Sequence, residues 1–323
     1  MYYCIINPSS RSGKGTDLWG TFEKKFIERK IEYKVIFTKG PGHALETVKM
    51  LTDPSNKEIE KPVKLVVLGG DGTMNEVVSG IMDFDNVMLG YIPVGSSNDL
   101  ARDLSLPSNL EEAMDTILDG RIIRRLDIGS LHYDTMTRTQ SRLHDMHQSD
   151  KRLFNVSAGI GFDASICEEA LSSGTKNLLN KLGLGKLTYG MIAIRQLFTA
   201  DRISCDIEMD DGKKIHLDHF LFVAIMVHKY EGGGFMFCPN ASDKDGMFDI
   251  CVVGDVKILR ALLALPSALK GQHYKIKGIY GFRTRKIKIH TMLPLWVHTD
   301  GEVSMKSDTI TLECLPAKLS LMM

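Results

Sequence analysis

Short apolar segments that end in glycine or small polar residues alternate with helix-like segments along the first 128 residues. The clearest example is the apolar run at 64–68, which is broken by Gly69-Gly70-Asp71-Gly72. Strands that are apolar on both faces and separated by helices form parallel sheets covered on both sides. The alternation therefore predicts a doubly wound α/β domain over residues 1–128.

The spacing of apolar side chains places the elements of this domain. Strands are expected at 2–6, 32–37, 64–68 and 87–92, and helices at 16–30, 44–51, 73–82 and 98–104.

After residue 128 the pattern changes to strand-like segments separated by turn residues, which predicts a mostly antiparallel β-sandwich over 129–312. Strands are expected at 153–156, 203–209, 220–227, 248–253, 286–290 and 309–312, and helices at 176–198 and 256–269. Residues 313–323 are expected to pack back on the first domain. The polar stretch 132–152 is interpreted as a mobile insertion or a long hairpin.

The composition excludes several classes of protein. The 40 basic and 40 acidic residues give no net charge, which argues against nucleic acid as the main partner. The six cysteines contain no Cys-x-x-Cys pair, so reduced cytosolic thiols are expected. No apolar run approaches the roughly 18 residues of a spanning helix, and the first residues do not resemble a signal peptide. We therefore expect a cytoplasmic globular protein.

Three strand ends in the first domain carry glycine or small polar residues and precede a predicted helix, namely 7–15, 69–73 and 95–98. Ligands of parallel sheets bind at the carboxyl ends of the strands, where helix N-termini offer free N–H groups to anions. One such loop alone can be a tight turn, but three at one edge favour a nucleotide or phosphate. The loops complete neither a Walker A motif nor a dinucleotide fingerprint.

Carboxylates accompany these strand ends. Asp71, Asp99 and Asp127 each lie at or just beyond one. Because an aspartate beside a triphosphate is repelled unless a cation intervenes, the three predict Mg²⁺, bound directly or through water. The alternative is helix capping or turn formation, which suits Asp99 taken alone. Asp300 in Thr299-Asp300-Gly301-Glu302 has by itself the pattern of an ordinary hairpin turn.

Several longer segments resemble the diacylglycerol kinase catalytic family in sequence order. The segment 69–77, GGDGTMNEV, is similar to the family's GGDGTxNEV signature, and 93–102, PVGSSNDLAR, to its P-x-G-T-x-N-D-x-A-R segment. Further matches are Asn7-Pro8-Ser9-Ser10, 125–127, 155–163, 232–234, 239–241, 244–246 and 300–302. The resemblance covers nearly the whole chain in the order of the small bacterial lipid kinases. Arg11-Ser12 departs from it, because the family usually has Gly directly after Asn-Pro-x-Ser.

The resemblance implies ATP in a cleft between an α/β and a β-rich domain, with transfer of the γ-phosphate to a lipid hydroxyl, most simply that of diacylglycerol. The residues that it assigns to the nucleotide are Asn7, Ser9, Ser10, Thr38, Gly70, Asp71, Gly72, Thr73, Asn75, Glu76 and Ser96. It assigns Asp71, Asp99 and Asp127 to a metal-linked carboxylate network.

The resemblance also assigns roles in the second half of the chain. Asp300 would accept the hydroxyl proton, with Glu302 beside it. Ser242, Asp245 and Met247 would hold a separate structural cation, the first and last through backbone carbonyls. An aspartate is a weak base at its ordinary pKa, yet it can act as the alcohol becomes acidic in the transition state.

Alternatives stay open at this point. GGDGT is shared with NAD kinases, so a soluble kinase of NAD or another small alcohol is the second hypothesis, and a catalytically silent nucleotide-binding module is the third. A lipid substrate implies a peripheral membrane surface, for which the candidates are 178–198 and the basic strand 283–288, although a core helix and a solvated edge fit them equally. An exposed strand edge leaves a homodimer open.

Overall fold

The computed structural model describes residues 1–120, 122–137, 149–172, 185–200 and 202–323. The chain divides into two compact units, the first comprising 1–128 and 316–323 and the second 129–315. Strands β5 (Ile123–Tyr133) and β14 (Glu302–Met322) each contribute residues to both units. Among the described residues, we find no helix with the length and apolarity needed to cross a membrane.

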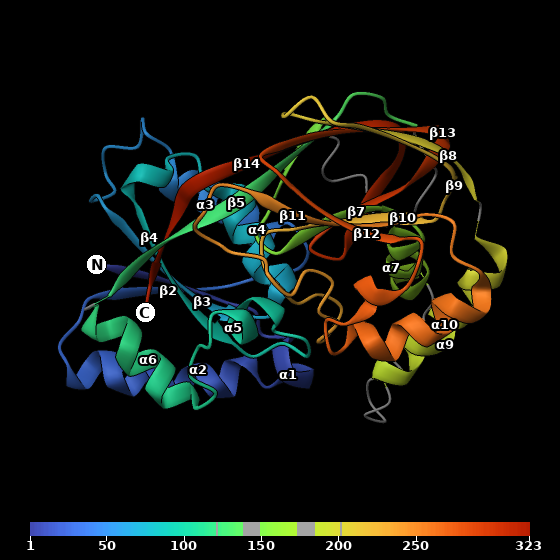
Figure 1. Cartoon of the computed structure of the whole chain (residues 1–323). Helices are drawn as coiled ribbons and strands as arrows, with labels where there is room; N and C mark the ends of the chain where they lie inside the picture. Colours follow the sequence, from blue (N-terminus) through green and yellow to red (C-terminus); the bar gives the residue numbers. More distant parts are fainter. Residues whose placement is uncertain (121, 138–148, 173–184, 201) are drawn as a thin grey trace. The chain divides into compact units, whose positions relative to one another are not determined.

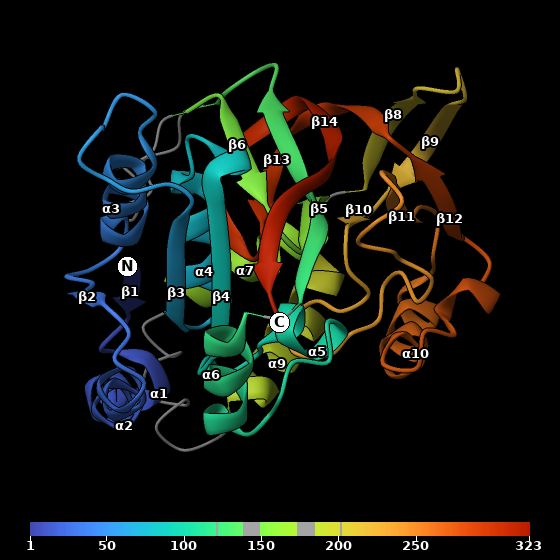
Figure 2. The same cartoon turned by 90° about the vertical axis from the view of Figure 1, so that its left-hand side faces the viewer.

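The first unit contains a parallel sheet. Its strands are β1 (Tyr2–Ile6), β2 (Tyr33–Phe37), β3 (Val63–Gly69) and β4 (Val87–Pro93). They lie side by side in the order β2–β1–β3–β4, and every pair is parallel (Figure 2). The end of β14 adds a fifth parallel strand, with Leu321 opposite Leu89. The carboxyl ends of β1, β3 and β4 therefore meet at one edge of the sheet.

Helices cover both faces of this sheet (Figure 1). They are α1 (Ser10–Gly13), α2 (Gly15–Glu28), α3 (His43–Thr52), α4 (Asp71–Gly80), α5 (Asp99–Asp103) and α6 (Leu110–Asp119), with a short 3₁₀ turn at Phe84–Asn86. Aromatic side chains of α2 and apolar side chains of α6 form one core with alternate residues of β1, β3 and β4. Arg29, the C-cap residue of α2, also bridges Asp115 and Asp119 of α6, each at 2.7 Å. Helices α3 and α4 pack together on the other face. The doubly wound α/β prediction is confirmed.

Helix α6 was not predicted, although its signals are present in the sequence. The side chain of Asn109 accepts hydrogen bonds from the backbone N–H groups of Glu111 and Glu112, which is a standard N-cap. Ala113, Met114 and Ile117 then recur at helical spacing and are buried.

The second unit is built from antiparallel strands. They are β6 (Lys151–Phe154), β7 (Ser157–Gly161), β8 (Ile203–Met209), β9 (Lys214–Phe220), β10 (Phe222–Met226), β11 (Phe248–Val253), β12 (Ile279–Thr284) and β13 (Lys286–Thr299), with parts of β5 and β14. One sheet runs β12–β11–β10–β7–β13–β14. The first part of β13 pairs with β8 and its last three residues pair with β7. A bulge between His290 and Leu295 separates these two parts of β13.

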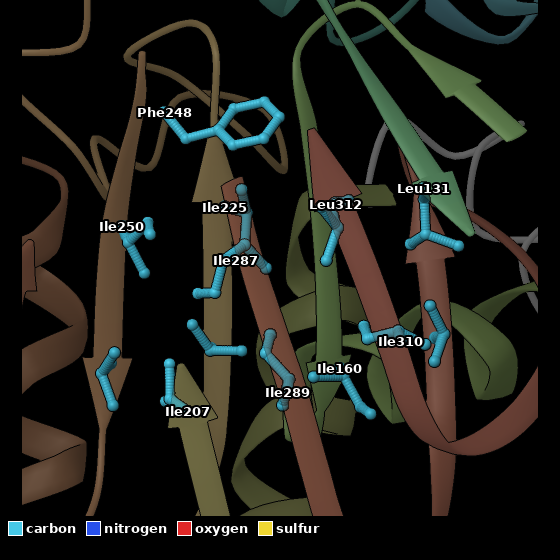
Figure 3. Packing of buried hydrophobic residues seen from close by; sticks show 14 of the residues in the cluster. Leu131, Ile160, Ile207, Ile225, Phe248, Ile250, Ile287, Ile289, Ile310 and Leu312 are labelled. Carbon is cyan, nitrogen blue, oxygen red and sulfur yellow. The ribbon is translucent and has the colours of Figure 1, made fainter. Parts of the chain in front are cut away.

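One apolar cluster of this unit lies between the strands (Figure 3). Its side chains alternate along each strand: Ile225 of β10 and Ile250 of β11 point into the cluster, whereas Ala224 and Cys251 lie in a second core on the opposite face. The predicted antiparallel β-sandwich is therefore confirmed.

Helices α7 (Phe162–Ser172), α9 (Gly185–Thr199) and α10 (Ile258–Ala268) cover the outer face of β10 and β11, and a 3₁₀ turn follows at His273–Lys275.

Helix α7 and strands β5, β7, β9 and β12 were not predicted. The helix expected at 176–198 is described only from residue 185, and the rest lies outside the described residues. The stretch 132–152 is a hairpin at its base, because His132 of β5 pairs with Lys151 of β6. All six cysteines are free thiols.

Candidate functional site

The loops that follow β3 and β4 touch each other. The backbone N–H of Val94 donates to the carbonyl of Gly69 over 2.9 Å. A Cβ atom on Gly95 would lie only 2.6 Å from the Cα of Gly70, so this close approach needs glycine at position 95. A Cβ atom on Gly70 would lie 3.1 Å from the Cα of Gly95, which is a tighter contact than usual. The Asn98 side chain closes the second loop by accepting from the N–H of Gly95 at 2.9 Å and donating to its carbonyl at 3.0 Å.

The loop after β1 joins these two. The Asn7 side-chain amide donates to the Thr73 hydroxyl over 2.9 Å, and its oxygen accepts from the N–H of Ser9 at 3.0 Å. Arg11 and Ser12, where the sequence departs from the family pattern, lie in the short helix α1, which ends at Gly13 with φ 94°. The expected convergence of the three loops at one sheet edge is therefore confirmed.

The first turn of α4 is suited to an anion. Its N-cap residue is Gly70, which has an extended backbone and no side chain to accept from the first N–H groups. Those N–H groups and the positive end of the helix dipole face the loop edge, an arrangement that binds phosphate in many proteins. The ten-residue helix starts directly at Asp71. Four of the predicted nucleotide residues, Gly70, Asp71, Gly72 and Thr73, lie in this turn.

Asp71 and Asp99 lie together at this edge. The backbone N–H of Asp99 donates to Oδ2 of Asp71 over 3.3 Å. Asp99 is 5% exposed, and its Oδ1 receives Nη1 of Arg102 at 2.7 Å. The arginine thus balances the charge of Asp99, whereas Asp71 brings the second negative charge. Asp99 is therefore more than a helix cap, because its buried carboxylate pairs with the exposed guanidinium of Arg102.

Tyr91 of β4 belongs to the same group and was missed by the sequence analysis. Burial, followed by the neighbouring carboxylates of Asp71 and Asp99, raises the pKa of this tyrosine well above its ordinary value, so the hydroxyl stays protonated as a donor. The sequence signal was a single polar group within the apolar strand 87–93. Arg102 was also missed, although it follows Asp99 by one helical turn.

The third expected carboxylate has a different contact. Asp127 is buried and accepts the backbone N–H of Ala317 at 2.7 Å, which fixes the start of the last part of β14. Within the part of the chain that the structure describes, no group of three or more His, Cys, Asp and Glu side chains is arranged to bind a metal ion. The donor set therefore does not fit a cation held directly by three aspartates. The Asp71–Asp99 pair does fit Mg²⁺ that keeps most of its water, the usual form beside phosphates.

The remaining predicted nucleotide residues differ in their surroundings. Glu76 accepts backbone N–H groups of Gly42 at 2.9 Å and Ala44 at 3.2 Å, so it fixes the start of α3. Asn75 is buried, Ser96 is exposed, and the N–H of Thr38 donates to the carbonyl of Ile6. Ser9 and Ser10 lie at the start of α1.

Asp300 in the second unit is held by the turn between β6 and β7. Its Oδ2 accepts from the backbone N–H of Asn155 at 2.8 Å and from the Asn155 side chain at 3.3 Å. Its Oδ1 accepts from the N–H groups of Val156 at 2.8 Å and Ser157 at 3.0 Å. The residue itself has φ 50°, an uncommon backbone state for a side chain other than glycine. The turn is thus built around this carboxylate, and an ordinary hairpin would not require that. Glu302 opens β14 two residues later.

A buried histidine lies two residues before Asp300. Nε2 of the fully buried His298 lies 3.2 Å from Oδ2 of Asp163 and 3.2 Å from Oε1 of Glu231. Burial lowers the pKa of this histidine, but the carboxylates of Glu231 and Asp163 outweigh burial and raise its pKa to about 9. The N–H of Gly301 contacts Nδ1 at 3.3 Å, so the histidine also touches the Asp300 turn. Sequence analysis gave none of these residues a role.

The expected structural cation site has a protein cation in its place. Nη2 of Arg283 pairs with Oδ2 of Asp245 at 2.5 Å, and the N–H of Met247 donates to Oδ1 at 3.0 Å. The guanidinium of Arg283 is therefore the partner of this carboxylate, and a cation held by Ser242, Asp245 and Met247 stays a prediction.

Comparison with known proteins agrees with this architecture. Residues 1–131 match the model of the diacylglycerol kinase catalytic domain, and 157–323 match that of the YegS C-terminal NAD kinase beta sandwich-like domain. The chain is 27% identical over 304 residues to a Bacillus subtilis (strain 168) protein named "Putative lipid kinase YtlR", covering 94% of this chain and 93% of the relative. It is 28% identical to the diacylglycerol kinase of the same organism, over 74% of this chain and 70% of the relative.

A solved structure shows the same fold. The crystal structure of a diacylglycerol kinase from Bacillus anthracis str. Sterne superposes with a TM-score of 0.69 at 19% identity, over 99% of this chain and 96% of that one. The matched second domain alone spans more than half of the chain. This chain therefore belongs to the family that carries the YegS C-terminal NAD kinase beta sandwich-like domain, which here follows a diacylglycerol kinase catalytic domain over residues 1–131.

Proposed function

We propose that the protein is an ATP-dependent lipid kinase that transfers the γ-phosphate to a lipid hydroxyl, with diacylglycerol as the acceptor and phosphatidic acid as the product. The observation that carries this proposal is the contact of Gly70 with Gly95 beside the Asp71–Asp99 pair. This contact brings helix N-termini and acidic side chains together at one edge of the parallel sheet, as polyphosphate binding requires. The names of the relatives support a lipid acceptor.

In this proposal the first unit binds the nucleotide. The N–H groups at the start of α4 bind the phosphates, and the Asn7–Thr73 hydrogen bond keeps the loop after β1 against that turn. Asp71 would hold hydrated Mg²⁺, while Arg102 keeps Asp99 neutralised. When bound, Mg²⁺ supplies neutralisation of the charge that develops on the transferred phosphoryl group.

In this proposal Asp300 takes the proton of the acceptor hydroxyl. A carboxylate has about four acceptor positions, and four donors already contact this one. The orientation of the Asp300 carboxylate is therefore fixed, and the carboxylate can accept a proton only when one of these four hydrogen bonds breaks. The 3.3 Å contact from the Asn155 side chain is the longest and is the one that we expect to give way.

The test is turnover of ATP-Mg²⁺ with diacylglycerol in mixed micelles by the wild type and by Asp300→Asn. We expect Asp300→Asn to lose about 10²- to 10⁴-fold in kcat, the usual contribution of a general base, with a KM for ATP within a few-fold of wild type. The matched control is Asp218→Asn, which removes an exposed carboxylate of β9 and leaves turnover unchanged. Near-UV circular dichroism and ATP binding show that each variant is folded.

Three results would contradict the proposal. Unchanged turnover of Asp300→Asn would remove the base assignment. Phosphorylation of NAD without detergent, together with no lipid product, would identify a soluble kinase. ATP binding without turnover over a broad panel of lipid alcohols would identify a catalytically silent module.

A further inference from the structure

Helix α10 of the second unit is apolar on both of its sides. Ile258, Ala261, Leu262 and Ala264 pack against the core that lies outside β10 and β11. The opposite side carries Leu259, which is 70% exposed, and Leu263, which is 63% exposed. Large exposed apolar side chains that lie together on a helix indicate a surface that something covers.

The exposed apolar side chains form one stripe. Leu259, Leu263 and Pro266 follow one another at four and three residues and are all exposed, which puts them on one face of the helix. Leu269 continues the exposed apolar surface directly after the helix end. We call these four residues the α10 stripe.

Helix α9 extends this surface. It contacts α10 and is drawn next to it in Figure 1. Phe198, 62% exposed, and Ile194 are exposed four residues apart on α9, whereas Leu197 is buried in the core. Membrane contact was expected at 178–198, of which residues 178–184 lie outside the described residues. The last turns of α9 carry both apolar side chains that are buried in the core and apolar side chains that are exposed.

The segment that carries the stripe is basic, although the exposed Asp255 directly precedes it. The segment 256–278 contains five basic residues and no acidic residue, although the chain as a whole is balanced at 40 and 40. The five are Lys257, Arg260, Lys270, Lys275 and Lys277, and all are exposed. An exposed apolar stripe bordered by lysine and arginine is the pattern of a helix that lies in the interface of an anionic bilayer.

We propose that α10 docks the protein on an anionic lipid bilayer, with the α10 stripe at the boundary of the acyl chains and the five basic side chains at the phosphates. A second copy of this chain fits less well, because a symmetric pairing of the stripe would bring two sets of five positive charges together. None of the residues of this docking surface is among those that the proposed function assigns to nucleotide binding or catalysis. Its use in delivering the acceptor rests on the proposed lipid kinase function, because that acceptor lies in a bilayer.

The test is co-sedimentation of the full chain, without ATP, with vesicles of phosphatidylcholine alone or with one third phosphatidylglycerol. We expect binding to the anionic vesicles, weakened at least tenfold by Leu259→Ser combined with Leu263→Ser. Lys257→Gln combined with Arg260→Gln should weaken binding to anionic vesicles and reduce its salt dependence. The matched control is Met292→Ser, an equally exposed apolar residue of β13, which should bind like wild type.

The outcomes separate docking from catalysis. Wild type that fails to sediment with anionic vesicles, or a double leucine variant that binds as well as wild type, would overturn the proposal. A stable dimer in gel filtration that Leu263→Ser dissociates would overturn it too, in favour of a second copy. Vesicle binding without phosphorylation of any lipid would leave docking in place and contradict the proposed function. If the docking proposal and the proposed lipid kinase function are both correct, the double leucine variant phosphorylates diacylglycerol in micelles but not in vesicles.

Discussion

The side-chain amide of Asn7 donates a hydrogen bond to the hydroxyl of Thr73 over 2.9 Å. The two residues are 66 positions apart, at the end of β1 and in the first turn of α4. The bond fixes the loop after β1 against the helix turn that we assign to the phosphates, so it connects the fold of the first unit with its chemistry.

Removing this bond tests the assignment. We expect Asn7→Ala to raise the KM for ATP about tenfold, because the loop is no longer held at the turn, and to cost only about 1 kcal/mol in unfolding free energy. Steady-state kinetics and urea unfolding measure the two effects. Asn86→Ala removes a comparable bond, to Asp83 at 2.8 Å, and should leave the KM unchanged. Equal KM values for the two variants would show that the loop does not serve the nucleotide.

The contact of the two glycine loops gives a second prediction. Gly95→Ala places a Cβ 2.6 Å from the Gly70 Cα, a backbone atom that cannot move aside cheaply, so we expect a loss of about 1–3 kcal/mol and at least tenfold weaker ATP binding. Gly20→Ala in α2 has open space around the new methyl group and should be neutral or stabilising by up to ~1 kcal/mol. Calorimetric titration with ATP and thermal unfolding check both. Wild-type ATP affinity in Gly95→Ala would contradict the arrangement of the loops.

His298 makes the stability of the second unit depend on pH. Its pKa is about 9 in the folded protein and about 6.5 when unfolded, so the folded state binds the proton more tightly. The resulting stabilisation is complete below pH 6.5 and is lost as the pH rises through 9. Urea unfolding between pH 6 and 9.5 should show this decline.

The control for this pH dependence is a second histidine paired with a carboxylate. His298→Gln should abolish most of the decline, whereas His216→Gln, which removes an exposed histidine paired with Asp206, should leave it intact. A wild-type protein whose stability stayed level from pH 6.5 to 9 would contradict a charged His298.

The same cluster depends on a glycine. Gly159 pairs with His298 across β7 and β13, and a Cβ there would lie 2.1 Å from Oδ2 of Asp163 and 2.6 Å from Nε2 of His298. We expect Gly159→Ala to destabilise the protein by about 1–3 kcal/mol and to flatten its pH dependence, because the ion pair is forced apart. Thermal unfolding at pH 6.5 and pH 9 measures both effects. An alanine variant with the wild-type pH dependence would show that the pair is not what stabilises this unit.

Local patterns predicted most of the first unit. The apolar strands 2–6, 64–68 and 87–92 lie within a residue or two of β1, β3 and β4, because strands buried on both faces leave continuous apolar runs. Strand β9, in contrast, was missed because Lys214–Phe220 is polar on its solvent face, and β7 because its glycines and serine resemble a turn.

The site was predictable where its chemistry is local and not where it depends on distant residues. The glycine loops and Asp71 can be recognised from patterns within ten residues of sequence. Asp300 resembles a simple turn because its hydrogen-bond donors lie 143 to 145 positions away. Likewise, Asp163 and Glu231 meet His298 only through the pairing of β7 with β13 and β10. Pairings of this kind are tertiary and leave no local signal.

In the proposed function, the loops after β1, β3 and β4 present ATP for transfer to a lipid hydroxyl. The most direct measurement incubates the wild type and Gly95→Ala with γ-labelled ATP, Mg²⁺ and a total lipid extract, and identifies the labelled product by mass. We predict that the wild type labels one phospholipid, phosphatidic acid, and that Gly95→Ala labels at least tenfold less. Label that remains in ATP, or that appears only in a water-soluble nucleotide, would contradict the account.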